Sequence, residues 1–208
     1  MIPVTPSKIV CVGRNYVAHA KELGNEVPER PMLFFKPPSA LIGSGDAIEL
    51  PPASAQVEYE GEIGVVIGRR LRRVDAAVAE RGIRGYVCAN DVTARDLQKP
   101  DGQWGRAKGF DTFCPVGERV AEGLDWRALS VVTRVNGAER QRAPATDMHF
   151  PIPDLVAYIS GVMTLEPGDL ILTGTPAGVG RLAPGDVVEV EIPGVGTLSN
   201  PVRSAPAS

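Results

Sequence analysis

The sequence predicts a β-rich α+β fold, and three observations carry this prediction. Short apolar runs rich in β-branched residues recur along the chain, and 23 glycines and 19 prolines separate them. Helical patterns are fewer, and they do not alternate strictly with the strand patterns, which argues against a doubly wound sheet. There is no internal repeat and no linker, so we expect one domain over residues 1–208.

Strands are predicted wherever an apolar run is bounded by glycine, proline or polar turn residues. In chain order, these segments are Ile9–Val12, Met32–Phe35, Ala47–Leu50, Ile63–Ile67, Gly85–Asn90, Ser130–Val135, Leu170–Thr173, Val187–Ile192 and Gly196–Val202. We expect residues 1–8 to form a lead-in and Ser204–Ser208 a frayed tail.

Helical spacing of apolar residues is clearest over Ile152–Leu165, where Leu155, Val156 and Ile159 lie on one stripe and Pro153 suits the first turn. Two shorter segments also fit a helix, Val17–Leu23 and Asp75–Arg81.

Composition and charge exclude several classes of protein. A net charge of −3 gives no electrostatic basis for binding nucleic acid or a membrane surface. We see no signal peptide and no apolar run long enough to span a bilayer, so we expect a cytoplasmic protein. Cys11, Cys88 and Cys114 lie far apart in apolar settings, which predicts reduced core cysteines.

Acidic residues alternate where the segment 57–68 begins, before it becomes an unbroken apolar run. On one strand, Glu58, Glu60 and Glu62 would share a face, about 6–7 Å apart, and would repel one another unless a cation lay among them. Oxygen donors of this kind suit Mg²⁺, Mn²⁺ or Ca²⁺. The alternative is the end of a strand whose carboxylates face water.

Asp91 follows another predicted buried strand, and Arg95 and Asp96 come shortly after it. Its carboxylate could cap a helix or form half of an ion pair. It could also be a third ligand of the site that Glu60 and Glu62 begin, which would leave about half of an octahedral Mg²⁺ shell open.

Three further features could carry chemistry. His19 and Glu22 are one helical turn apart, so the carboxylate could hold the imidazole as a general base, although a surface pair is the alternative. Lys36 and Lys108 follow apolar or aromatic residues and could be drawn toward an anionic substrate, unless they merely extend to solvent. The turn 173–180 is glycine-rich but lacks the Gly-Lys-Ser/Thr ending of a phosphate loop.

Taken together, these motifs resemble the fumarylacetoacetate hydrolase family, in family order, over about residues 9–200. The matching motifs are Gly13-Arg14-Asn15-Tyr16 with His19 and Glu22, Phe35-Lys36-Pro37, Tyr59-Glu60-Gly61-Glu62, Asp91-Val92-Thr93-Ala94-Arg95-Asp96-Leu97-Gln98, Ala107-Lys108-Gly109-Phe110-Asp111 and Thr173-Gly174-Thr175-Pro176-Ala177-Gly178-Val179-Gly180. The resemblance is closest to the short members of the family: acylpyruvate hydrolases, oxaloacetate decarboxylases and isomerases of aromatic catabolism.

The resemblance implies a mixed β-roll of several sheets, a homodimer and a set of site residues. The implied metal ligands are Glu60, Glu62 and Asp91, with Mg²⁺ or Mn²⁺ as the expected ion, Ca²⁺ as a substitute, and Glu58 outside the set. The implied catalytic residues are His19, Glu22 and Lys108, and the implied substrate-binding residues are Arg14, Lys36, Gln98 and Thr175. Residues 14–31 match a lid, here short and polar over Ala20–Arg30.

The function that the resemblance implies is a metal-dependent hydrolase that cleaves a C–C bond in acylpyruvate-type 2-oxo acids through a metal-bound pyruvate enolate. His19, held by Glu22, would activate the attacking water. Oxaloacetate decarboxylation and 2-oxo-3-enoate isomerisation use the same carboxylate triad and remain alternatives. A non-catalytic, metal-stabilised binding module is the alternative from another class, although such a module has no need of a water-activating pair.

Overall fold

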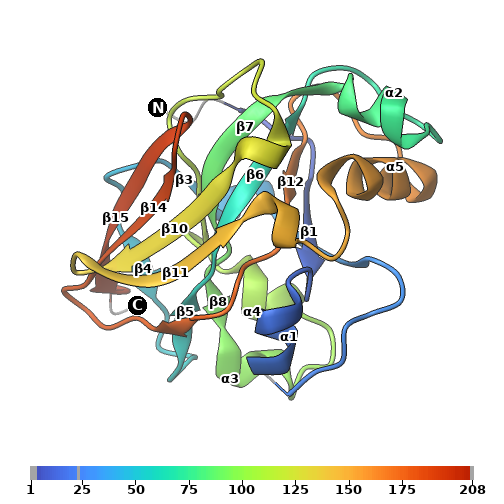
Figure 1. The fold of residues 1–208 in the computed structure, drawn as a ribbon. Helices are drawn as coiled ribbons and strands as arrows, with labels where there is room; N and C mark the ends of the chain where they lie inside the picture. Colours follow the sequence, from blue (N-terminus) through green and yellow to red (C-terminus); the bar gives the residue numbers. More distant parts are fainter. Residues whose placement is uncertain (1–3, 23, 207–208) are drawn as a thin grey trace.

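Two five-stranded mixed sheets pack face to face and form the body of the molecule in the computed structural model, which describes residues 4–22 and 24–206 (Figure 1). The first has the order β2-β1-β12-β6-β7, formed by Met32–Lys36, Ile9–Gly13, Leu170–Leu172, Gly61–Ile67 and Ile83–Asn90. The second has the order β11-β10-β14-β15-β4, formed by Ala138–Pro144, Ser130–Val135, Val187–Ile192, Gly196–Ser204 and Ile48–Leu50. The β-rich α+β fold is confirmed.

Two smaller sheets accompany the two large ones. One has the order β13-β5-β8, formed by Gly180–Arg181, Val57–Tyr59 and Thr93–Ala94, and the other pairs β3 with β9, formed by Leu41–Ile42 and Cys114–Pro115. The helices are short: α1 Val17–Glu22, α2 Ala76–Glu80, α3 Arg95–Gln98, α4 Gly105–Gly109 and α5 Ile152–Val162. Among the described residues, we find no helix both long and apolar enough to cross a membrane.

The largest core cluster lies between the two large sheets and under α5. All seven residues of β6 are buried, and Ile63, Val65 and Ile67 face Val131 and Val190 of the other sheet within this cluster. A strand buried on both sides reads as a continuous apolar run, which is the pattern of this segment. The core therefore fixes β6 in place, and with it the acidic residues at its start.

Every predicted strand is present, with ends shifted by one or two residues in most cases. The predicted helices are also present, but α5 ends at Val162, because Met163 is extended and Leu165 pairs with Leu71. Ser204 belongs to β15 and is not part of a frayed tail. Leu23, residues 1–3 of the lead-in and residues 207–208 lie outside the described residues. The three cysteines are free and buried, as predicted.

Strands β3, β5, β8, β9 and β13 were not predicted, and each has only two or three residues. The longer strand β11 was also missed, because five of its seven residues are exposed. It pairs with β10 across a turn at Asn136 and Gly137, both of which have positive φ. Asn-Gly between two strands is a strong hairpin signal, and it could have identified β11 from the sequence. The inward-facing positions of β11 are Gln141 and Ala143.

Candidate active site and metal centre

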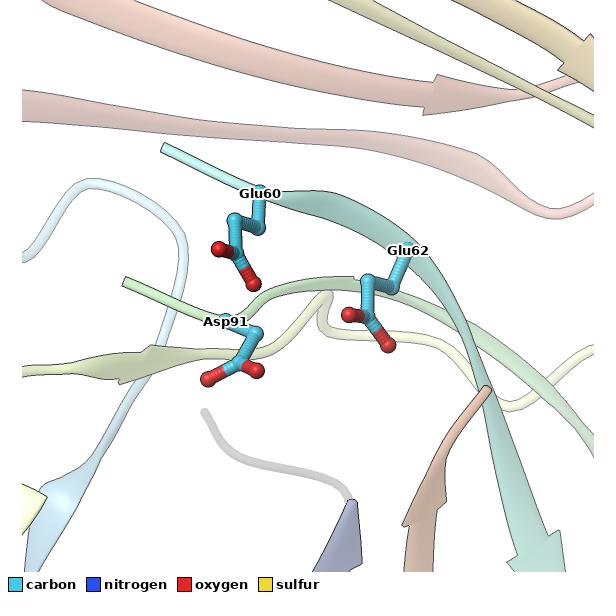
Figure 2. A group of neighbouring side chains, drawn as sticks. All are labelled: Glu60, Glu62 and Asp91. Carbon is cyan, nitrogen blue, oxygen red and sulfur yellow. The ribbon is translucent and has the colours of Figure 1, made fainter. Parts of the chain in front are cut away.

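The side chains of Glu60, Glu62 and Asp91 point toward one another at the place where β6 begins and β7 ends (Figure 2). One carboxylate oxygen from each residue lies within 4.8 Å of those of the other two, and all three residues are buried. Antiparallel pairing of Gly61 with Asn90 brings the two segments together, and Asp91 N donates to Glu60 O at 2.8 Å. The fold thus brings together the three predicted ligands.

Glu58 does not belong to this cluster, and the argument that placed three glutamates on one strand face was wrong for it. The chain leaves β5 at Tyr59 and begins β6 at Gly61, in a different sheet, so Glu60 stands at a break between two strands. Glu58 Oε2 accepts instead from Arg95 Nε at 2.7 Å, and Glu58 Oε1 accepts from Gln56 at 2.6 Å.

Two buried ammonium groups adjoin the cluster. Lys108 Nζ donates to Glu60 Oε2 at 2.7 Å and to Asp91 Oδ2 at 2.6 Å. Lys36 Nζ donates to the carbonyls of Val92, Lys108 and Phe113 at 2.9, 2.6 and 2.7 Å, and it lies 2.8 Å from Asp91 Oδ1. Asp91 is therefore an ion-pair partner and also a member of the carboxylate cluster, so the two interpretations of its sequence position hold together.

The charges around each carboxylate set its protonation. Burial by itself would raise the pKa of Glu60, but the cations of Lys108 and Arg95 hold it well below its usual range. Burial also works to lower the pKa of Lys108, yet Asp91 and Glu60 raise it, so its ammonium persists. Glu62 makes no ion pair within the described part of the chain. Burial and the negative charges of Asp91 and Glu60 raise its pKa well above the usual range.

This donor set fits a divalent cation. Three buried carboxylates offer oxygen ligands only, the kind that Mg²⁺ and Mn²⁺ prefer. Lys36 and Lys108 already pair with Asp91, whereas Glu62 carries a charge that its surroundings oppose and that forms no ion pair among the described residues. A cation among the three carboxylates would offset this unpaired charge of Glu62.

Glu62→Gln tests this assignment without breaking an ion pair. We expect a higher Tm in EDTA, because a buried, repelled charge is lost while an amide oxygen can still accept from Gly174 N, at 2.6 Å from Glu62 Oε2. Each kcal/mol is worth about 2–4 °C. We also expect most of the Mg²⁺-dependent rise in Tm to disappear. Glu189→Gln, on β14, is the matched control for thermal unfolding. An undiminished rise in Tm with Mg²⁺ in Glu62→Gln would refute the assignment of Glu62 as a metal ligand.

His19 and Glu22 lie close together on α1. His19 Nδ1 is 3.5 Å from Glu22 Oε2, the imidazole is buried, and Glu22 is about one third exposed, at 35%. Burial lowers the pKa of His19, although the negative charge of Glu60 opposes the shift. The imidazole is therefore neutral near pH 7, and its other nitrogen is free to accept a proton.

Glu22 has a second partner, which ties α1 to the glycine-rich turn. Both of its carboxylate oxygens lie 3.1 Å from the Gly178 N–H. At the other end of the turn, Gly174 N donates to Glu62. The N–H groups of this turn thus bind carboxylates of the protein itself, and the turn connects the acidic cluster to the helix that carries His19.

A small cavity of about 60 Å³ contains the candidate site. Its lining includes the predicted residues Arg14, His19, Gln98, Lys108 and Thr175 together with the three carboxylates, and it also includes Asn25, Phe34, Arg95 and Trp104. Lys36 does not line it, because its ammonium is enclosed by backbone carbonyls behind Asp91. Glu22 stands behind His19 and does not line it either.

Arg95 is a site residue that the sequence interpretation left unassigned. Its guanidinium donates to Glu58, Gln98 and Glu60, so it orients one carboxylate of the cluster and one candidate substrate-binding amide. It lies four residues after Asp91, at the start of α3. An arginine in this position with three acidic residues upstream could have indicated such a role from the sequence.

The family model for the fumarylacetoacetate (FAA) hydrolase C-terminal domain matches residues 8–203, nearly the whole chain. The chain belongs to the fumarylacetoacetate hydrolase family. The family resemblance predicted from the motifs is thereby confirmed. The chain is an enzyme of this family, which leaves a non-catalytic binding module without support.

Proteins named for an enzymatic activity are among those similar to this chain. The chain is 45% identical to "Oxaloacetate tautomerase FAHD1, mitochondrial" of Arabidopsis thaliana, covering 91% of this chain and 87% of that protein. It is 43% identical to "Oxaloacetate decarboxylase, mitochondrial" of Dictyostelium discoideum, covering 93% and 92%. The crystal structure of 2-hydroxyhepta-2,4-diene-1,7-dioate isomerase from Mycobacterium marinum superposes with a TM-score of 0.92 at 48% identity, covering 99% and 78%.

Proposed function

We propose that this enzyme interconverts the keto and enol forms of a small 2-oxo dicarboxylic acid, of which oxaloacetate is the simplest probe. One observation carries the proposal: a neutral, buried imidazole and a buried ammonium line the same small cavity, beside three converging carboxylates. The names of the Arabidopsis and Dictyostelium relatives support oxaloacetate as the first substrate to test.

His19 is the proposed base. The imidazole removes a proton from the carbon next to the 2-oxo group, and the electron pair of that C–H bond forms the new C=C bond. The carbonyl π pair moves to the 2-oxo oxygen, which takes a proton from water to complete the enol, and the imidazolium returns its proton to water. Glu22 holds the imidazole through Nδ1 and stabilises the imidazolium that forms, while its bond to Gly178 keeps α1 against the turn.

Lys108 is the proposed electrostatic partner. Its ammonium is held at 2.6–2.7 Å by Asp91 and Glu60, so it needs no reorganisation when negative charge develops on the substrate oxygen. Gln98 and Arg14 also line the cavity and are the proposed contacts for a substrate carboxylate. A divalent cation held by Glu60, Glu62 and Asp91 would supply further positive charge for the carboxylate and 2-oxo oxygens.

Hydrolysis of an acylpyruvate is the second candidate, and the paired His19 and Glu22 favour it. A histidine oriented by a carboxylate can remove a proton from water, which then attacks the distal carbonyl. The bond from that carbonyl carbon to C3 breaks and leaves its electron pair on C3. In hydrolysis His19 takes the proton from water, whereas in tautomerisation it takes the proton from the substrate carbon.

Assays on one enzyme preparation test both candidates. We expect oxaloacetate enol absorbance to decay faster with enzyme and Mg²⁺ than with Mg²⁺ alone, and EDTA should abolish the difference. Pyruvate release reports decarboxylation, and loss of acetylpyruvate reports hydrolysis. Acetylpyruvate turnover without any effect on the oxaloacetate tautomers would replace the first proposal by the second.

A further inference from the structure

Gln141 of β11 is a buried polar residue behind the carboxylate cluster, 1% exposed. Its Oε1 accepts from Gly61 N at 3.0 Å, and its Nε2 donates to Thr175 Oγ1 at 2.7 Å and to Pro176 O at 2.8 Å. One amide therefore joins β11 to the start of β6 and to the glycine-rich turn. Gly61 stands between Glu60 and Glu62, so these bonds connect the acidic segment directly to Thr175.

The partners of Gln141 fix the direction of each hydrogen bond. A backbone N–H can only donate and a backbone carbonyl can only accept, so Oε1 faces Gly61 and Nε2 faces Pro176. Nε2 therefore donates to the Thr175 hydroxyl as well. That hydroxyl lies 2.9 Å from Gly61 O, which can only accept and so takes its single proton. No hydroxyl hydrogen of Thr175 remains for a ligand.

Packing prevents this network from rearranging easily. A Cβ built on Gly61 would lie 1.9 Å from Thr133 Oγ1 and 3.3 Å from Gln141 Oε1, so the second large sheet presses directly on this backbone. Thr133, Gln141 and Thr175 are all buried. If the Thr175 proton turned toward the cavity, Gly61 O would lose its partner in a region that water does not reach, which is costly.

We propose that Gln141 is a positioning residue. By donating to Thr175 Oγ1 and accepting from Gly61 N, it holds the hydroxyl so that its proton stays on Gly61 O and its second lone pair accepts from a ligand in the cavity. Thr175 then selects a ligand atom that carries a hydrogen, such as the hydroxyl of an enol, and gives nothing to a carboxylate oxygen. This inference deepens the proposed function and takes its enol ligand from it.

Oxamate and oxalate distinguish a Thr175 hydroxyl that accepts from a ligand from one that donates to it. The two ligands have nearly the same shape, but oxamate has an NH₂ donor in place of one carboxylate oxygen. Their Kd values are measured by calorimetry at fixed Mg²⁺. We expect Thr175→Val to weaken oxamate binding about 3- to 10-fold, as for one lost hydrogen bond, and to leave oxalate within about twofold. Thr175→Ser should keep the wild-type preference, and exposed Thr197→Val is the control.

The outcomes for Thr175→Val are unambiguous. A loss of oxalate affinity as large as that of oxamate would mean that the hydroxyl donates to ligands, and the proposal would be overturned. An unchanged affinity for both would mean that it faces no ligand, which overturns the proposal equally. Binding is measured without turnover. Inactivity on oxaloacetate would therefore count against the proposed function, while the Kd values would still test the role of Thr175.

Gln141→Met tests the positioning step. We expect the affinity for oxamate relative to oxalate to fall to the value measured for Thr175→Val, although Thr175 is intact. The exposed control Gln103→Met should keep the wild-type ratio of the two affinities. Gln141→Asn retains an amide that is one methylene too short, and it serves if the methionine variant does not fold. A wild-type preference in a folded Gln141 variant would show that Gln141 does not hold Thr175.

Discussion

Lys36→Met is expected to destabilise the protein by about 3–5 kcal/mol, the range for removing one partner of a buried ion pair. Methionine has a similar length but leaves the carbonyls of Val92, Lys108 and Phe113 without their donor and removes one of two cations from Asp91. Urea unfolding in EDTA measures the effect without a contribution from bound metal.

The control is Lys99→Met, an exposed lysine whose replacement should change the free energy of unfolding by less than about 0.5 kcal/mol. The sequence resemblance implied a different role for Lys36, contact with the substrate. That role predicts a raised KM with little change in stability. An unchanged free energy of unfolding in Lys36→Met would therefore contradict the buried ion pair and the three carbonyl contacts of Lys36.

His19→Ala is expected to lower enol–keto interconversion by about 10²–10⁴-fold, because the base that moves the proton is lost. Acylpyruvate hydrolysis, if the enzyme has it, should fall by a similar factor, since it also needs a base. Metal-dependent decarboxylation of oxaloacetate should fall less, because that step removes CO₂ and no proton. The measurement is kcat/KM for the three reactions with Mg²⁺.

Glu22→Gln is the matched variant for this experiment. Its amide oxygen can still accept from Gly178 N, so α1 stays on the turn, but the charge beside His19 is lost. We expect a milder version of the His19→Ala pattern. Equal losses in all three reactions for His19→Ala would mean that His19 supports substrate binding or closure of α1, and that it is not the base.

The pH dependence of the wild-type enzyme should also show the titration of His19 as the base. Burial lowers the pKa of His19 from its ordinary value of 6.5, so the neutral, proton-accepting form persists below that pH. The acidic limb of kcat/KM for interconversion, which reports groups of the free enzyme, should therefore lie below pH 6.5 and should be absent from the residual activity of His19→Ala. An acidic limb that survives in this variant would assign the titration to another group.

The sequence by itself determined nine of the fifteen described strands, because their signal is local. β6 reads as an apolar run between glycines, and burial on both sides is what such a run requires. It also determined the family and the three clustered carboxylates, since their residue types and order survive without coordinates. Strand β11 was accessible in the same way through its Asn136-Gly137 turn, although its polar residues concealed it.

Only the tertiary structure decided which charges meet. Glu58 and Glu60 are two residues apart and look equivalent in sequence, and Arg95 contacts both. Yet a change of sheet at Glu60 leaves Glu58 with Arg95 and Gln56 only and brings Glu60 into the cluster. Lys36 and Lys108 look alike as well, but one is enclosed by carbonyls and the other lines the cavity. The bonds of Gln141 join segments 34 and 80 residues away from it. A buried polar group takes its role from whichever partners satisfy it, and sheet packing chooses those partners across distances that no local pattern records.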